Sequence, residues 1–104
     1  MAAATVTQER WGYSISGDTG AATVGGGGTL KIKTVTFSGN ADNATGLLTS
    51  GAGGRTTTTL KFKTNGNDLD MGGHAVTFGD KGVEMENVIV TLSNASDHMC
   101  IFLV

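Results

Sequence analysis

Short alternating segments separated by glycine are the feature that most constrains how this chain folds. Glycine occurs 17 times, threonine 16 times and proline not at all. Threonine favours strands, and glycine and asparagine favour the turns between them. Apolar and polar residues alternate with the two-residue period of a strand. We predict strands over residues 10–16, 29–38, 55–64, 75–78, 83–86, 88–93 and 99–104.

The same composition argues against substantial helix. The best helical stretch, residues 41–50, is interrupted by Gly46, and Gly, Thr and Val are poor helix formers. A chain of 104 residues with 23 Leu, Ile, Val and Phe residues supports one domain with a thin core. We predict an all-β fold: a single-domain, antiparallel β-sandwich, jelly-roll-like, with about seven or eight short strands. Residues 1–9 should be a flexible N-terminal arm, and residues 10–104 the sandwich domain.

Side-chain phase within these strands predicts further details. Leu30 and Ile32 share a face opposite two lysines, but Val35 and Phe37 fall on the lysine face. Such a change predicts either a bulge near Thr34 or burial of different faces at the two ends of the strand. Residues 75–78 and 83–86 are predicted to form a hairpin around residues 79–82. The lysine pairs should face solvent or a partner: Lys31/Lys33 and Lys61/Lys63. The core should include Leu30, Ile32, Leu60, Phe62, Val76, Phe78, Val88 and Val90.

Charge and hydropathy exclude several classes of function. No run of 18 apolar residues exists, so no membrane-spanning helix is expected. The first residues lack the basic and apolar regions of a secretory signal. A net charge of −2, with seven scattered basic residues, gives no electrostatic footprint for nucleic acid. We therefore expect neither nucleic-acid nor membrane partners.

Candidate chemical sites are weak throughout the sequence. Three oxygen-bearing side chains share one loop, but no acid follows at the spacing of a calcium loop, so a polar turn is favoured over a metal site. Two histidines 24 residues apart favour exposed loop residues over metal ligands. Paired acids on one strand fit a solvated face better than a glycosidase. The only cysteine, Cys100, fits a small buried hydrophobe better than a nucleophile. The three oxygen-bearing side chains of the loop are Asn67, Asp68 and Asp70. The two histidines are His74 and His98, and the paired acids are Glu84 and Glu86. We predict no enzyme activity, no cofactor and no metal.

The last predicted strand, residues 99–104, is apolar throughout. A strand with one wet face alternates, and this one does not, so both faces should be covered. One interpretation is a partner chain, in a homo-oligomer or on a capsid-like lattice. The competing interpretation is a central strand enclosed within one chain. The predicted partner interface consists of Met99, Ile101, Phe102, Leu103 and Val104.

Taken together, the layout resembles the small all-β virion proteins of tailed bacteriophages. The resemblance lies in the strands at residues 11–15 and 30–39, the stretches 73–78, 82–83 and 87–93, and the apolar strand at residues 100–103. It implies a non-enzymatic structural protein of the virion, assembled in the host cytoplasm. Such proteins decorate or cement a capsid through contacts with the major capsid protein, or sit in a tail, neck or fibre. A carbohydrate-binding β-sandwich module is the alternative, with Trp11 and Tyr13 as its sugar-stacking candidates.

Overall fold

The computed structural model describes residues 2–39, 44–52, 55–63 and 74–104. Within them the chain forms ten strands and a single 3-10 turn, η1, and no α-helix. The prediction of an all-β fold without substantial helix is confirmed. The elements are β1 (Thr5–Glu9), β2 (Gly12–Ser16), β3 (Ala22–Thr23), η1 (Gly25–Gly27), β4 (Thr29–Ser38), β5 (Thr45–Ala52), β6 (Arg55–Lys63), β7 (His74–Thr77), β8 (Val83–Glu86), β9 (Ile89–Leu92) and β10 (His98–Leu103).

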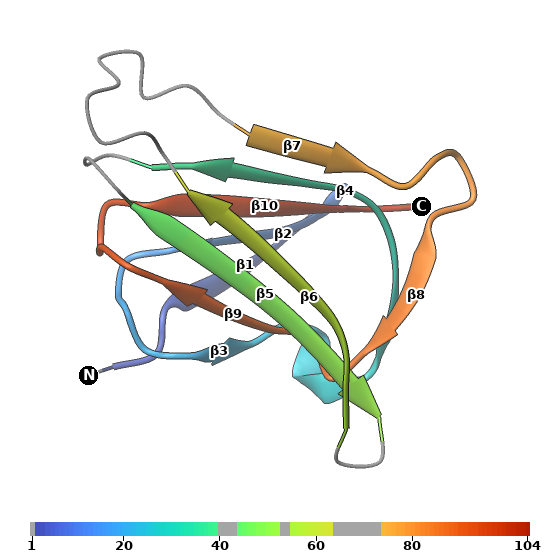
Figure 1. Ribbon diagram of the computed structural model, residues 1–104, viewed down its shortest axis with the longest axis horizontal. Coiled ribbons are helices and arrows are strands. Elements are labelled where there is room, and N and C mark those ends of the chain that lie inside the picture. Colours follow the sequence, from blue (N-terminus) through green and yellow to red (C-terminus); the bar gives the residue numbers. More distant parts are fainter. Residues whose placement is uncertain (1, 40–43, 53–54, 64–73) are drawn as a thin grey trace.

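The strands form two antiparallel sheets that pack face to face, with β5 and β6 running obliquely across β10 and β4 (Figure 1). The large sheet has six strands in the order β1-β2-β10-β4-β7, with β8 also paired to β4. The small sheet has four strands in the order β3-β9-β5-β6. With β7 and β8 counted as one strand and β1 set aside, this is the order of an eight-stranded jelly roll. The sandwich prediction is therefore confirmed.

Strands β7 and β8 do not form the hairpin that the sequence predicts. Both pair with β4 instead: β7 with residues 34–37, and β8 with residues 29–32. The two strands thus lie end to end along one edge of β4, and the turn at residues 78–82 projects from that edge (Figure 1). Gly79 and Gly82 have positive φ and close this turn, where Gly82 N–H donates to Gly79 O at 3.1 Å. The predicted turn is confirmed, but each short strand pairs with β4, which is longer than either of them.

The bulge predicted near Thr34 is confirmed. Phe102 of β10 lies opposite Thr34, but the next residue, Leu103, lies opposite Ile32, so Lys33 has no partner in β10. One extra residue reverses the side-chain phase of a strand. Both halves of β4 consequently bury their apolar residues: Leu30, Ile32, Val35 and Phe37.

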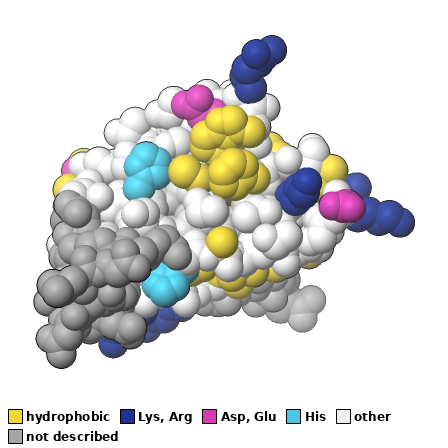
Figure 2. Space-filling model, turned by 90° about the horizontal axis from the view of Figure 1, so that it is seen from above, with side chains coloured by type: hydrophobic (Ala, Val, Ile, Leu, Met, Phe, Trp, Pro, Cys, Tyr) yellow, Lys and Arg dark blue, Asp and Glu magenta, His cyan; other side chains and the backbone are white. Residues whose placement is uncertain are grey.

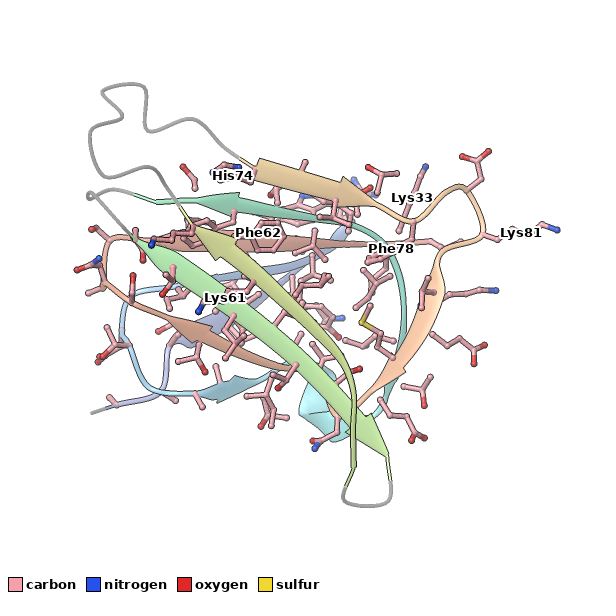
Figure 3. The ribbon with its side chains drawn as sticks, viewed as in Figure 1. Lys33, Lys61, Phe62, His74, Phe78 and Lys81 are labelled. Carbon is pink, nitrogen blue, oxygen red and sulfur yellow. The ribbon has the colours of Figure 1, made fainter. Side chains whose placement is uncertain are left out.

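The core lies between the two sheets. Phe37 of the large sheet stacks on Phe62 of the small sheet, with ring centroids 5.8 Å apart, and Figure 3 shows Phe62 between the sheets. Of the eight predicted core residues, Leu30, Ile32, Phe62, Val88 and Val90 are buried. Leu60, Val76 and Phe78 are partly buried and pack against that core. Wholly buried residues outside the predicted set include Ile15, Val24, Val35, Phe37, Leu48, Leu92, Met99 and Ile101.

The exposed lysines and the N-terminal segment complete the fold. All four paired lysines are exposed, as predicted, and Lys31 lies opposite Glu84 of β8. Residues 5–9 differ from the expected arm, because they form β1, an edge strand of the large sheet paired along its length with β2. Backbone pairing requires no apolar side chains, so a polar segment can join a sheet edge. Ala4 is buried, and its N–H donates to Gly20 O at 3.1 Å.

Candidate interaction surface

The outer face of the large sheet, which points away from the small sheet, carries many side chains that can form hydrogen bonds or react chemically. Its membership follows from register, because the alternate residues Ile15, Val35, Phe37, Met99 and Ile101 are buried inward. Three rows of neighbouring residues cross this outer face. They are Thr5-Ser16-His98-Ser38, Thr7-Ser14-Cys100-Thr36-Ala75 and Glu9-Gly12-Phe102-Thr34-Thr77.

Short hydroxyl side chains dominate these rows, and Glu9 is their one residue with a full charge at neutral pH. A sheet face of such short side chains offers a broad surface with many hydrogen-bonding groups. The space-filling view shows exposed hydrophobic side chains gathered in a patch, surrounded mainly by uncharged polar and backbone atoms (Figure 2). These three rows therefore combine low charge with local apolar exposure. Other charged residues of the outer face lie where β8 pairs with β4: Lys31, Glu84 and Glu86.

An aromatic pair supplies the largest side chains of this surface. The rings of Trp11 and Phe102 stack with centroids 4.6 Å apart and planes 28° apart. Trp11 lies in the turn between β1 and β2 and is 38% exposed. Leu103 N–H donates to Trp11 O at 2.9 Å, which fixes that turn to the end of β10. The pair is thus held in place from two elements while one of its rings remains accessible.

Ser14 and His98 meet on the same face, although 84 residues separate them in the sequence. Ser14 Oγ lies 2.7 Å from His98 Nε2, and the tautomer of the ring decides which of the two donates. His98 is the exposed first residue of β10, where the sequence predicts an exposed turn residue. A serine–histidine pair works as a nucleophile and base when a third group orients the histidine. Within the described residues the His98 ring contacts Ser14, and this contact joins β2 to β10.

Cys100 lies between Ser14 and Thr36 on the outer face and is only partly buried, whereas the sequence predicts a small buried hydrophobe. Outward phase within β10 places it there. Burial is the main cause that raises the pKa of the Cys100 thiol; the hydrogen bond with Thr36 lowers the pKa, and the charge of Glu9 raises it. The thiol consequently stays protonated at neutral pH, which makes it a poor nucleophile.

The structure divides the five residues of the predicted partner interface. Met99 and Ile101 are wholly buried in the core, so the prediction is wrong for these two. β10 lies inside the large sheet between β2 and β4, which is the enclosed position of the competing interpretation. Phe102 and Leu103 are partly buried, and Val104 is 60% exposed. For these three residues a partner contact remains a prediction.

The turn before β10 depends on a buried carboxylate, Asp97, that the sequence did not single out. Its Oδ2 accepts from Ser93 Oγ at 2.9 Å and from the Asn94 N–H at 3.0 Å. Ser93 Oγ in turn accepts from the Thr45 N–H of β5 at 2.8 Å. Charge-assisted bonds of this kind are stronger than neutral ones. The bonds to Asp97 order the turn, and the Ser93 hydroxyl joins the end of β9 to β5.

The remaining candidates do not converge on a site. His74 is exposed at the start of β7, on the opposite edge of the large sheet from β1 (Figure 3). Glu86 lies opposite Thr29, whose Oγ1 donates to it at 3.3 Å, so the acids of β8 belong to a polar strand face. The loop with the three candidate calcium ligands Asn67, Asp68 and Asp70 lies outside the described residues. Within the described ranges, no group of three His, Cys, Asp or Glu side chains could hold a metal ion.

Comparison with known proteins adds no family to these observations. No family model, no curated protein and no solved structure matches the chain. Among the described residues, no helix is long and apolar enough to cross a membrane.

Proposed function

We propose that this chain is a non-enzymatic structural protein of a virion that decorates or cements a bacteriophage capsid through protein–protein contacts. The contact surface is the outer face of the large sheet, and the major capsid protein is the partner. One observation carries the proposal: the stacked Trp11–Phe102 pair, with Trp11 accessible, beside three rows of the outer face in which Glu9 is the one full charge.

The composition of this face matches what protein interfaces require. The cores of such interfaces are depleted in charge and enriched in aromatic residues. Binding energy concentrates in a few large side chains, among which Trp is prominent, and surrounding contacts exclude water. Trp11 and Phe102 have the chemistry of such a centre, and the hydroxyls of Ser14, Thr34 and Thr36 have that of the surrounding ring.

The fold supports the proposal by analogy. Jelly rolls occur in viral capsid proteins, and also in lectins and cupins. One architecture hosts many functions, so the fold alone does not identify a capsid protein. The evidence for that function comes from the residues of the outer face. The resemblance to small all-β virion proteins in the sequence points in the same direction.

Two measurements test the proposal. In virus particles purified from the source of this sequence, quantitative mass spectrometry should find hundreds of copies of the chain per particle. In co-sedimentation with particles stripped of the protein, Trp11→Ala should weaken binding by about tenfold or more. Val83→Ala is the matched control, since Val83 of β8 is also 38% exposed but lies off this face. A few copies per particle would indicate a tail, neck or fibre position, and equal binding by both variants would refute the proposed face.

The exposure of Trp11 also favours a second candidate, a carbohydrate-binding module. Sugars stack on accessible aromatic rings, and hydroxyl and imidazole groups nearby can hydrogen-bond to them. A buried Trp11 would have argued against this function, and Trp11 is 38% exposed. A glycan array decides the point: binding that is lost in Trp11→Ala and kept in Val83→Ala would favour the module over the capsid protein.

A further inference from the structure

The four edges of the two sheets are not equally protected against pairing with another chain. An edge strand presents unpaired N–H and C=O groups, and proteins shield such edges with charges, interruptions or short strands. The edge formed by β7 and β8 is broken by the turn at residues 78–82 and carries Glu84 and Glu86. The edge strand β6 carries the exposed Lys61 and Lys63. Both edges are therefore poor templates for a further strand.

The two remaining edges lie on the side of the N-terminus and differ from each other. β3 has only two residues, and Gly20, just before it, exchanges hydrogen bonds with Ala2 and Ala4. β1 has five residues, pairs with β2 on one side, and pairs with no strand of the described residues on the other. Its sequence, Thr-Val-Thr-Gln-Glu, contains no lysine and a single charge at its end, and every residue but Val6 is exposed. β1 is thus the edge without a shielding feature.

We propose that β1 pairs with β1 of a second copy of this chain, antiparallel and about a twofold axis through Thr7, so that two large sheets become one. This inference does not depend on the proposed function. The register about Thr7 pairs all five residues of each strand. Thr7 faces Thr7 of the partner subunit, Thr5 faces Glu9 of the partner subunit, and Val6 faces Gln8 of the partner subunit.

Charge and face both suit this register. The two Glu9 carboxylates lie at opposite ends of the pairing, about 13 Å apart along the strands, so like charges are not opposed. Threonine pairs across neighbouring strands are favourable. Each residue meets one of the same side-chain phase, so Val6 stays on the inner face and Thr5 and Thr7 stay on the outer face. An isologous contact of this type closes at two copies and does not propagate.

Sedimentation equilibrium of the complete chain tests the pairing. A small interface gives a weak dimer, so the measurement should extend to a chain concentration of about 1 mM. At the twofold axis, Thr7→Lys places the lysine of one copy opposite the lysine of the other. The two like charges repel, so this variant should raise the dimer dissociation constant by about tenfold or more. Thr77→Lys is the matched control: Thr77 is an exposed threonine on the other edge of the same outer face. It should leave the constant unchanged. A chain that stays monomeric throughout, or a dimer that Thr7→Lys does not weaken, overturns the proposal.

Cysteine cross-linking provides a second test that does not rely on the lysine variant staying folded. Residues directly opposite in antiparallel strands have Cα atoms about 4.5 to 5.5 Å apart, within disulfide range. In a Cys100→Ser background, Thr7→Cys should oxidise to a covalent dimer, and Thr77→Cys should not. Cross-linking of Thr7→Cys at or below the level of Thr77→Cys would overturn the proposal. Circular dichroism of each variant confirms that the fold is retained.

Discussion

The two faces of strand β10 carry similar side chains in different surroundings. Met99 and Ile101 point inward and are wholly buried, whereas Cys100 and Phe102 point outward and are partly buried. The core explains the inward pair completely. Packing in the core does not account for the apolar character of the outward pair, and the contact with Trp11 accounts for Phe102 alone. A strand that is apolar on both faces thus serves two purposes: stability on one side and, under the proposed function, binding on the other.

The first prediction tests the inner face, where the largest loss of stability is expected. Ile101→Ala should lower the free energy of unfolding by about 2 to 5 kcal/mol, because it removes buried methyl groups and leaves a cavity. Urea denaturation followed by circular dichroism measures the loss. A loss below about 1 kcal/mol would show that the inner face of β10 contributes little to the core.

The second prediction concerns the residue that the inner face packs against. A Cβ at Gly46 of β5 would collide with the Phe37 ring and crowd the Met99 methyl group. Gly46→Ala should therefore cost about 1 to 3 kcal/mol by overpacking. Gly28→Ala is the control, because Gly28 has φ −78° and only an ordinary contact at 3.6 Å. It should change stability by less than about 0.5 kcal/mol, and equal losses in the two variants would contradict this account of the core.

Comparing these positions shows why some of the fold could be predicted from the sequence. Alternation within β4 revealed both its buried residues and its bulge, because a phase change is a local signal. The pairing of β7 and β8 with β4 could not be predicted in this way, since it depends on which long strand lies nearby in space. β10 has no alternation, so the sequence could not assign its faces, and Met99 and Ile101 were wrongly placed at an interface.

The third prediction tests the outer face. Phe102→Ala should cost about 1 kcal/mol of stability, mostly from the lost aromatic stacking, and clearly less than Ile101→Ala. It should also expose the only tryptophan of the chain, so acrylamide should quench Trp11 fluorescence more strongly. A loss of stability equal to that of Ile101→Ala would mean that the two faces of β10 do not differ in energetic role.

The candidate surface was even less predictable than the fold. Ser14, His98, Cys100 and Thr36 come from three strands, and only the order β2-β10-β4 places them side by side. Nothing local in the sequence signals that order. The exposure of Trp11 likewise follows from its position in a turn next to the end of β10, which single-strand patterns do not describe.

The last and smallest effect is the titration of Cys100 on the outer face. Burial raises the pKa of its thiol above the ordinary value of 9.0, so the folded state favours the protonated form. The unfolded thiol ionises first as pH rises. The stability contributed by Cys100 is therefore present below the unfolded pKa and is lost as the pH rises through the folded pKa. Rates of alkylation by iodoacetamide, measured against pH, should give a midpoint above that of an unfolded peptide.

Two neighbours of Cys100 should move that midpoint in opposite directions. Glu9→Gln removes a negative charge that raises the pKa of the thiol, so the midpoint should fall. Thr36→Val removes a hydrogen bond that lowers the pKa, so the midpoint should rise. Burial is the largest cause of the shift, so both changes should be smaller than the difference from the unfolded peptide. A midpoint at or below the peptide value would mean that solvent covers the outer face of β10 at Cys100, and that the two faces differ more than the structure shows.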